Sequence, residues 1–192
     1  MVICLVVCDQ IGVLDVKDST MNHACDRHHL LLEKLIALPR HIVATHGTEN
    51  LAEFILHELC DDDCFALRKA AFFVDNPDFN CLKGVAGIDG AQRFEQRAWE
   101  DQDAFTGHMS QVPFNQQVRL VHRPSAHRKD HSWQREAADL AQEIDVRDHE
   151  WHVFPIKHGN TGVLIFEPSS SWQAYDDLIG CGAALLALCP IF

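Results

Sequence analysis

Residues 150–167 read EWHVFPIKHGNTGVLIFE, and this stretch decides the fold. Two runs rich in β-branched and aromatic residues, 151–157 and 162–167, flank a His-Gly-Asn-Thr-Gly turn. Such a pattern predicts two antiparallel strands joined as a hairpin. Because side chains alternate along a strand, we expect His152 and Phe154 on the same face of the first strand.

The rest of the chain alternates helical and strand patterns. Apolar residues at mixed three- and four-residue spacing predict helices, and short apolar runs between turn residues predict strands. The expected helices cover 28–44, 48–59, 132–144 and 170–189, with a polar helical connection at 89–107, and the further strands cover 68–75, 79–88 and 116–122. Pro39 is expected to kink or divide the first helix. Since tight turns join consecutive strands, we expect an α/β (α+β) fold in which helices flank a central antiparallel sheet of five to six strands.

Gly84 and Gly87 interrupt the strand expected over 79–88. Their Gly-Val-Ala-Gly pattern lies within a hairpin strand and not between a strand and a helix, so it does not indicate a phosphate-binding loop. Glycine inside a strand instead indicates a bulge or the close approach of another element.

The bulk composition is that of an ordinary globular protein. Hydrophobic residues make up 47% and charged residues 23% of the chain. Its 192 residues suffice for one domain, 28–192, after an N-terminal extension, 1–27, that we expect to be a strand or a docking segment. The net charge of -12 opposes contact with a phosphate backbone, so nucleic acid is not an expected partner.

The eight cysteines follow no regular disulfide framework, and no secretory signal precedes them. We therefore expect reduced thiols and a cytoplasmic location. The mostly apolar run 178–192 has 15 residues, and a helix needs roughly 20 to span a bilayer. No membrane segment is expected.

Three passages carry a resemblance to a known family. They are 49–59 leading into 69–75, 151–156 followed by 162–166 with Pro155 before the turn, and the closing helix at 174–178. Their order resembles the GAF domain over residues 28–189, and the expected sheet is GAF/PAS-like. The resemblance implies a regulatory domain of a signalling or transcription-regulatory protein, which senses a small molecule without turnover and forms a homodimer through its terminal helices. The Asn-Lys-Phe-Asp-Glu signature of the cyclic-nucleotide-binding members is absent, so the ligand stays open.

The resemblance places the ligand between the sheet and the connection over about 90–131. A mixture of apolar walls and a few polar side chains there suits a small molecule. The residues expected to bind it are Phe73, Trp99, Phe105, His108, Phe114, His122, His152 and Phe154.

Two alternatives belong to other functional classes. Cys25, His28 and His29 form the densest group of metal-capable side chains, and thiolate with imidazole suits zinc or another transition metal. This group favours a metal- or thiol-dependent redox sensor or enzyme, in which Cys81 could take part. The other alternative is an interaction module with a filled core. The chain has no Gly-x-Ser-x-Gly elbow, and no other motif indicates catalysis.

Overall fold

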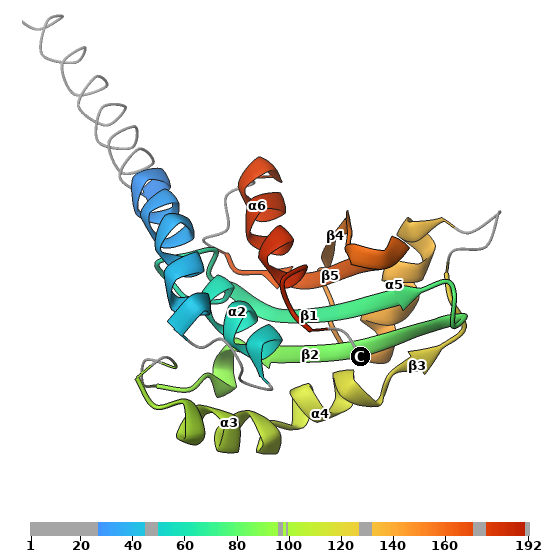
Figure 1. Ribbon diagram of the computed structural model, residues 1–192, viewed down its shortest axis with the longest axis horizontal. Coiled ribbons are helices and arrows are strands. Elements are labelled where there is room, and N and C mark those ends of the chain that lie inside the picture. Colours follow the sequence, from blue (N-terminus) through green and yellow to red (C-terminus); the bar gives the residue numbers. More distant parts are fainter. Residues whose placement is uncertain are drawn as a thin grey trace, which may run out of the picture.

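The fold is a five-stranded antiparallel sheet with helices on both faces (Figure 1). A computed structural model describes residues 27–44, 50–95, 98, 100–126, 132–170 and 176–190. The strands lie in the order β3-β2-β1-β5-β4, with the bounds β1 Leu67–Asn76, β2 Cys81–Asp89, β3 His122–Arg123, β4 Glu150–Pro155 and β5 Thr161–Pro168. The expected α+β architecture is confirmed. The N-terminal extension up to residue 26 lies outside the described residues.

The hairpin of β4 and β5 forms as the sequence predicts. Phe154 pairs with Gly162 across the two strands. A Cβ atom on Gly162 would lie 2.5 Å from the Phe154 ring, so glycine is what allows this ring to lie over the neighbouring strand. The Phe154 ring stacks on Phe72 of β1 and on His152, at centroid distances of 6.0 and 6.1 Å. The hairpin joins the sheet through the antiparallel pairing of β5 with β1, and this row of rings packs across the strands on one face.

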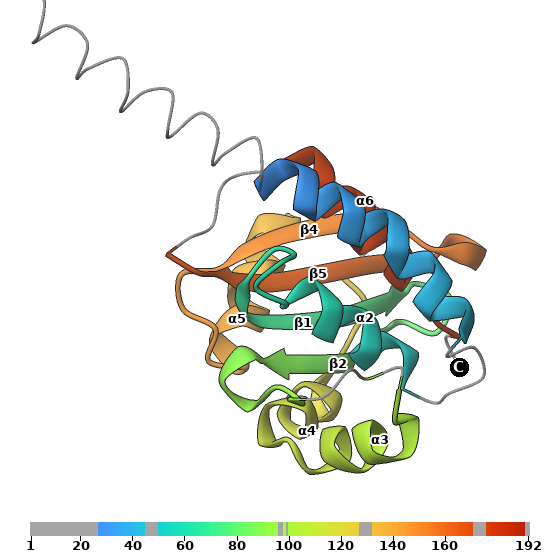
Figure 2. The same ribbon diagram turned by 90° about the vertical axis from the view of Figure 1, so that its left-hand side faces the viewer.

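One face of the sheet carries the helix over residues 27–44, α2 (Leu51–Leu59) and α6 (Asp176–Leu186) (Figures 1 and 2). Gly182 of α6 packs against Leu59 and Phe65, where a Cβ atom would come within 2.8 Å of the Leu59 side chain. The helix over 27–44 continues through Pro39 and is not divided there. Because Pro39 is exposed, water can satisfy the carbonyl that loses its helical partner.

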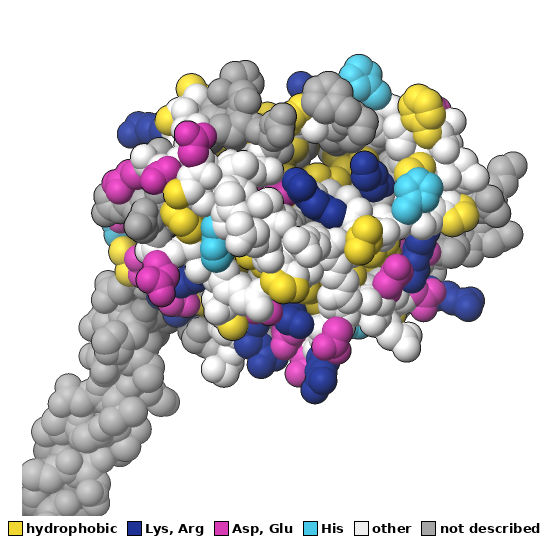
Figure 3. All heavy atoms as spheres, turned by 90° about the horizontal axis from the view of Figure 1, so that it is seen from below, with side chains coloured by type: hydrophobic (Ala, Val, Ile, Leu, Met, Phe, Trp, Pro, Cys, Tyr) yellow, Lys and Arg dark blue, Asp and Glu magenta, His cyan; other side chains and the backbone are white. Residues whose placement is uncertain are grey.

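The other face carries α4 (Pro113–Leu120) and α5 (Trp133–Glu143), and α3 (Gln102–Gln111) leads into α4. Figure 3 views the molecule from below α3 and α4, where side chains of both charges are interspersed with hydrophobic ones. Gly84 and Gly87 of β2 provide the surface on which α4 packs. A Cβ atom on Gly84 would lie 1.9 Å from the Val118 carbonyl oxygen, and one on Gly87 would lie 2.6 Å from the Val118 side chain. The predicted close approach at these glycines is thus confirmed.

The strand predicted over 116–122 is wrong for most of its length. Residues 113–120 form α4, and only His122 and Arg123 pair with β2. Pro113 at the first helical position and the buried side chain of Asn115 favour the helix. The helix is then held by tertiary contacts, because Val118 packs against the two glycines of β2.

Candidate functional site

A cavity of about 720 Å³ lies beside the turn between β1 and β2. Its walls come from both strands of this hairpin, from α4, from the turn before β5 and from the segment after α6. The lining residues are Val74, Asn76, Phe79, Cys81, Lys83, Gly84, Val85, Arg119, Asn160 and Pro190. This volume falls within the range of about 300 to 1,000 Å³ that small-molecule sites occupy.

A β-bulge shapes the wall of this cavity. Phe72 pairs with Ala86 and Phe73 with Gly84, so Val85 is an extra residue in β2. A bulged residue leaves the regular ladder and its carbonyl needs another donor. The Val85 carbonyl accepts a hydrogen bond from Nε of Arg119 at 3.2 Å. The bulge therefore holds the guanidinium of α4 at the cavity.

Arg119 also belongs to a buried polar network. Its Nη2 donates to Oε1 of Glu53 at 2.5 Å, and Glu53 is 1% exposed. Asn115 donates to the same carboxylate and to the Met109 carbonyl, and it accepts from the Gly87 backbone N–H. Burial raises the pKa of Glu53 above 4.5, and the charge of Arg119 opposes this shift. The network thus connects the cavity wall to α2.

Cys81 and His122 meet at the edge of the cavity. The Cys81 Sγ lies 3.3 Å from Nε2 of His122, and the thiol is partly exposed. Burial raises the pKa of Cys64 and of Cys189 to about 12, which keeps these thiols protonated at neutral pH. Cys81, in contrast, is partly exposed and lines the cavity, so solvent and ligands can reach its thiol.

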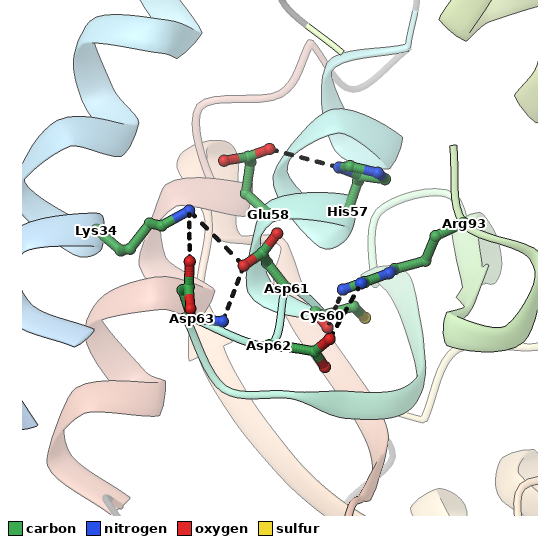
Figure 4. Close-up of polar contacts among 8 residues, drawn as sticks. All are labelled: Lys34, His57, Glu58, Cys60, Asp61, Asp62, Asp63 and Arg93. Carbon is green, nitrogen blue, oxygen red and sulfur yellow. Dashed lines mark hydrogen bonds and ion pairs between the residues drawn. The ribbon is translucent and has the colours of Figure 1, made fainter. Parts of the chain in front are cut away.

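A second cavity, of about 480 Å³, is polar (Figure 4). Lys34 lies 3.6 Å from Asp61 and 4.0 Å from Asp63, and Nη1 of Arg93 donates to the Cys60 carbonyl at 2.9 Å. His57 is buried between Glu58 and the Phe94 carbonyl, at 3.4 and 3.1 Å. The ion pairs of Lys34 join the helix over 27–44 to the loop after α2, and carboxylates outnumber cations in the lining of this cavity.

The predicted ligand-binding residues do not gather at one place. Phe73, Phe105 and Phe114 are buried in the core, Phe154 is buried beside Phe72, and Trp99 lies outside the described residues. His108 is 2.9 Å from the Gln92 carbonyl through its Nε2 atom, while His152 stacks on Phe154 near Gly180 of α6. His122 contacts the 720 Å³ cavity through Cys81.

The predicted metal group cannot be assembled from the residues that the structure describes. Cys25 lies outside them, and His28 and His29 are exposed on the helix over 27–44. His29 lies 3.8 Å from Glu33 on the same helix. Among the described side chains, no group of three or more His, Cys, Asp and Glu is arranged to hold a metal ion. A metal site that includes Cys25 stays a prediction.

Lys83, Arg119 and Asn160 were not predicted as site residues. They come from β2, α4 and the turn before β5, which lie far apart in the sequence. Only the glycine pair at 84 and 87 gave a local signal, because it indicated that another element approaches β2 at this point.

Comparisons of the chain with protein-family models, curated proteins and solved structures gave no match. The function therefore has to be argued from the geometry of the cavity. Across the described residues, no helix combines the length and the apolar character that crossing a membrane requires.

Proposed function

We propose that this chain is a GAF-like regulatory domain that binds a small molecule without turnover, as part of a signalling or transcription-regulatory protein. The observation that carries the proposal is the cavity of about 720 Å³ beside the turn between β1 and β2. Apolar side chains of Val74 and Val85 form part of its lining, and Lys83, Arg119 and Asn160 supply a few polar groups. This combination is typical of small-molecule sites.

The position of the cavity supports a regulatory role. Pro190, which follows α6, lines it directly, and Arg119 connects it to Glu53 of α2. A ligand that contacts both residues would favour particular positions of α2 and α6. Such a bias of helix position is how binding changes the population of conformations.

We also propose that the terminal helices form the homodimer. Ile36 and Val43 are 68% and 74% exposed and lie seven residues apart, on one side of the helix over 27–44. The variant Ile36→Glu, Val43→Glu should be monomeric in light scattering after size exclusion, while the wild type should have the mass of a dimer. Equal masses for both proteins would refute this interface.

We propose a cytoplasmic location because the described thiols are free. Cys60 and Cys64 are both buried and are not joined by a disulfide, although they are only four residues apart. Reduced cysteines persist in a reducing compartment. Fluorescence microscopy of a tagged chain in its native cell checks this.

Native mass spectrometry of freshly purified protein tests ligand binding. Val85→Trp places a large ring in the cavity, and Leu120→Trp is a matched control because Leu120 is 83% exposed and is not part of the lining. Wild type and Leu120→Trp should retain a small-molecule adduct, and Val85→Trp should lose it. Retention of the same adduct by a folded Val85→Trp variant would contradict binding in this cavity.

A further inference from the structure

We propose that the ligand of this cavity is a small molecule with an apolar body and one anionic group, such as a carboxylate, which Lys83 and Arg119 bind. This inference rests on the proposed function and specifies the ligand's chemistry. It follows from the charges of the lining residues, from one buried amide and from the apolar walls of the same cavity.

The charges at the cavity are opposite to those of the whole chain. The net charge of the chain is -12, but the described lining contains two cations, Lys83 and Arg119, and no carboxylate. Among the described residues, no acceptor lies within hydrogen-bonding distance of Nζ of Lys83 or Nη1 of Arg119. An anionic group can therefore bind here without displacing Glu53.

The side chain of Asn160 indicates that the ligand carries a polar group at the same place. Asn160 is 8% exposed and lines the cavity. Its backbone groups are satisfied, because its N–H donates to the Lys157 carbonyl and its carbonyl accepts from Ile156. Within the described part of the chain, its side-chain amide has no hydrogen-bonding partner. Its amide atoms are not fully enclosed and it lines the cavity, so a ligand can hydrogen-bond to this amide in place of water.

The remaining walls require an apolar body on the ligand. Val74 is buried at the cavity, Val85 is half-buried, and Phe79 is 81% exposed at the tip of the hairpin. A ligand that covers the Phe79 ring removes apolar surface from water, which is favourable. The anionic group then lies towards Lys83, and the apolar body lies along the valines.

Three probes with one alkyl chain and different head groups test this inference. Octanoate, octanol and octylamine are titrated into the full chain by calorimetry at pH 7.5 and at low salt, at concentrations where each probe is dissolved as a monomer. We expect octanoate to bind about tenfold more tightly than octanol, because hydrogen bonds between charged groups are stronger than those of a neutral hydroxyl. We expect octylamine to bind least tightly, because its positive charge is repelled by Lys83 and Arg119.

Lys83→Gln and Arg135→Gln each remove one positive charge. Comparing them distinguishes the effect of a charge at the cavity from the effect of the net charge of the chain. Lys83→Gln should reduce the preference for octanoate over octanol, because only Arg119 then binds the carboxylate, and it should leave octanol binding unchanged. Arg135→Gln should keep the preference, since Arg135 is exposed on α5 and is not part of the cavity lining. Loss of the preference in both variants would overturn the assignment of Lys83.

The remaining outcomes distinguish this inference from the proposed function. If wild type binds octanol and octanoate equally, and Val85→Trp binds neither, the cavity is a ligand site but the anionic class is wrong. If wild type binds none of the probes and retains no adduct in native mass spectrometry, both the inference and the proposed function fail.

Discussion

Gly84→Ala tests whether α4 packs on β2 as closely as described. The new Cβ atom would lie 1.9 Å from the Val118 carbonyl oxygen and 2.7 Å from its carbonyl carbon. Both atoms belong to the backbone of α4, so no side-chain rotation can relieve the contact. The helix must move by about 1 Å to restore an ordinary contact, and a well-packed protein resists such a shift.

The expected loss of stability combines two effects. Overpacking costs about 1 to 3 kcal/mol. A movement of α4 also weakens the hydrogen bond between Arg119 and Glu53, which is 2.5 Å long and joins two charged groups, and such a bond contributes about 1.5 to 3 kcal/mol. We therefore expect Gly84→Ala to lower the free energy of unfolding by about 2.5 to 6 kcal/mol.

Gly107→Ala is the matched control. Gly107 lies inside α3, it is exposed, and a Cβ atom there would have no neighbour within 4 Å. Alanine is favoured over glycine in a helix by about 1 kcal/mol, so this variant should be slightly more stable than wild type. Urea unfolding followed by far-ultraviolet circular dichroism measures both variants. If Gly84→Ala lies within about 1 kcal/mol of wild type, the packing of α4 on β2 is refuted.

Three further predictions concern buried groups. Because burial raises the pKa of Glu53 above 4.5, the folded state holds more protons than the unfolded state as pH rises above that value. The stability of wild type relative to Glu53→Gln should therefore fall between pH 4 and the raised pKa and then stay constant. Urea unfolding of both proteins across this pH range measures it, and a relative stability that rises with pH would contradict the prediction. Asp75 is fully buried and accepts hydrogen bonds from Ser125 Oγ and the Ala126 N–H, at 3.0 and 3.2 Å. Asp75→Ala removes the acceptor of both hydrogen bonds and should cost about 2 kcal/mol or more in urea unfolding; an unchanged unfolding midpoint would contradict this prediction. Burial raises the pKa values of Cys60 and Cys64, so both thiols should react with iodoacetamide at pH 8 only after the protein unfolds. Peptide mass spectrometry measures this labelling. Rapid labelling of the folded protein would disprove their burial.

The hairpin over 150–167 could be predicted because its signals are local. Alternation along the strands and the Gly-Asn turn both lie within 18 residues, and the backbone agrees with them: His158 and Gly159 adopt φ values of 63° and 73° in the turn. The α+β architecture follows from the same kind of local pattern, repeated along the chain.

The conformation of residues 116–122 could not be read from local pattern. Val118 and Val121 favour a strand when taken alone. In the structure the contact of Val118 with Gly84 and Gly87 determines the outcome, and those glycines are about 30 residues away in the sequence. Tertiary packing therefore overrides the local preference here.

The cavity could not be predicted from spacing. Lys83 and Asn160 meet there because β1 lies between β2 and β5 in the sheet, so that the start of β2 and the turn before β5 lie at the same end of the sheet. Four of the predicted ligand-binding residues are instead buried in the core, because large rings are favoured where helices pack on a sheet: Phe73, Phe105, Phe114 and Phe154.

Protection of Cys81 from alkylation tests the proposed ligand site most directly. Cys81 lines the cavity, and Cys181 is exposed on α6, so the same protein contains its own reference thiol. Iodoacetamide labelling of both residues is followed by peptide mass spectrometry, with and without saturating octanoate. We expect octanoate to slow the labelling of Cys81 and to leave the rate at Cys181 unchanged. Equal rates at Cys81 with and without octanoate, while calorimetry shows that octanoate is bound, would contradict binding in this cavity.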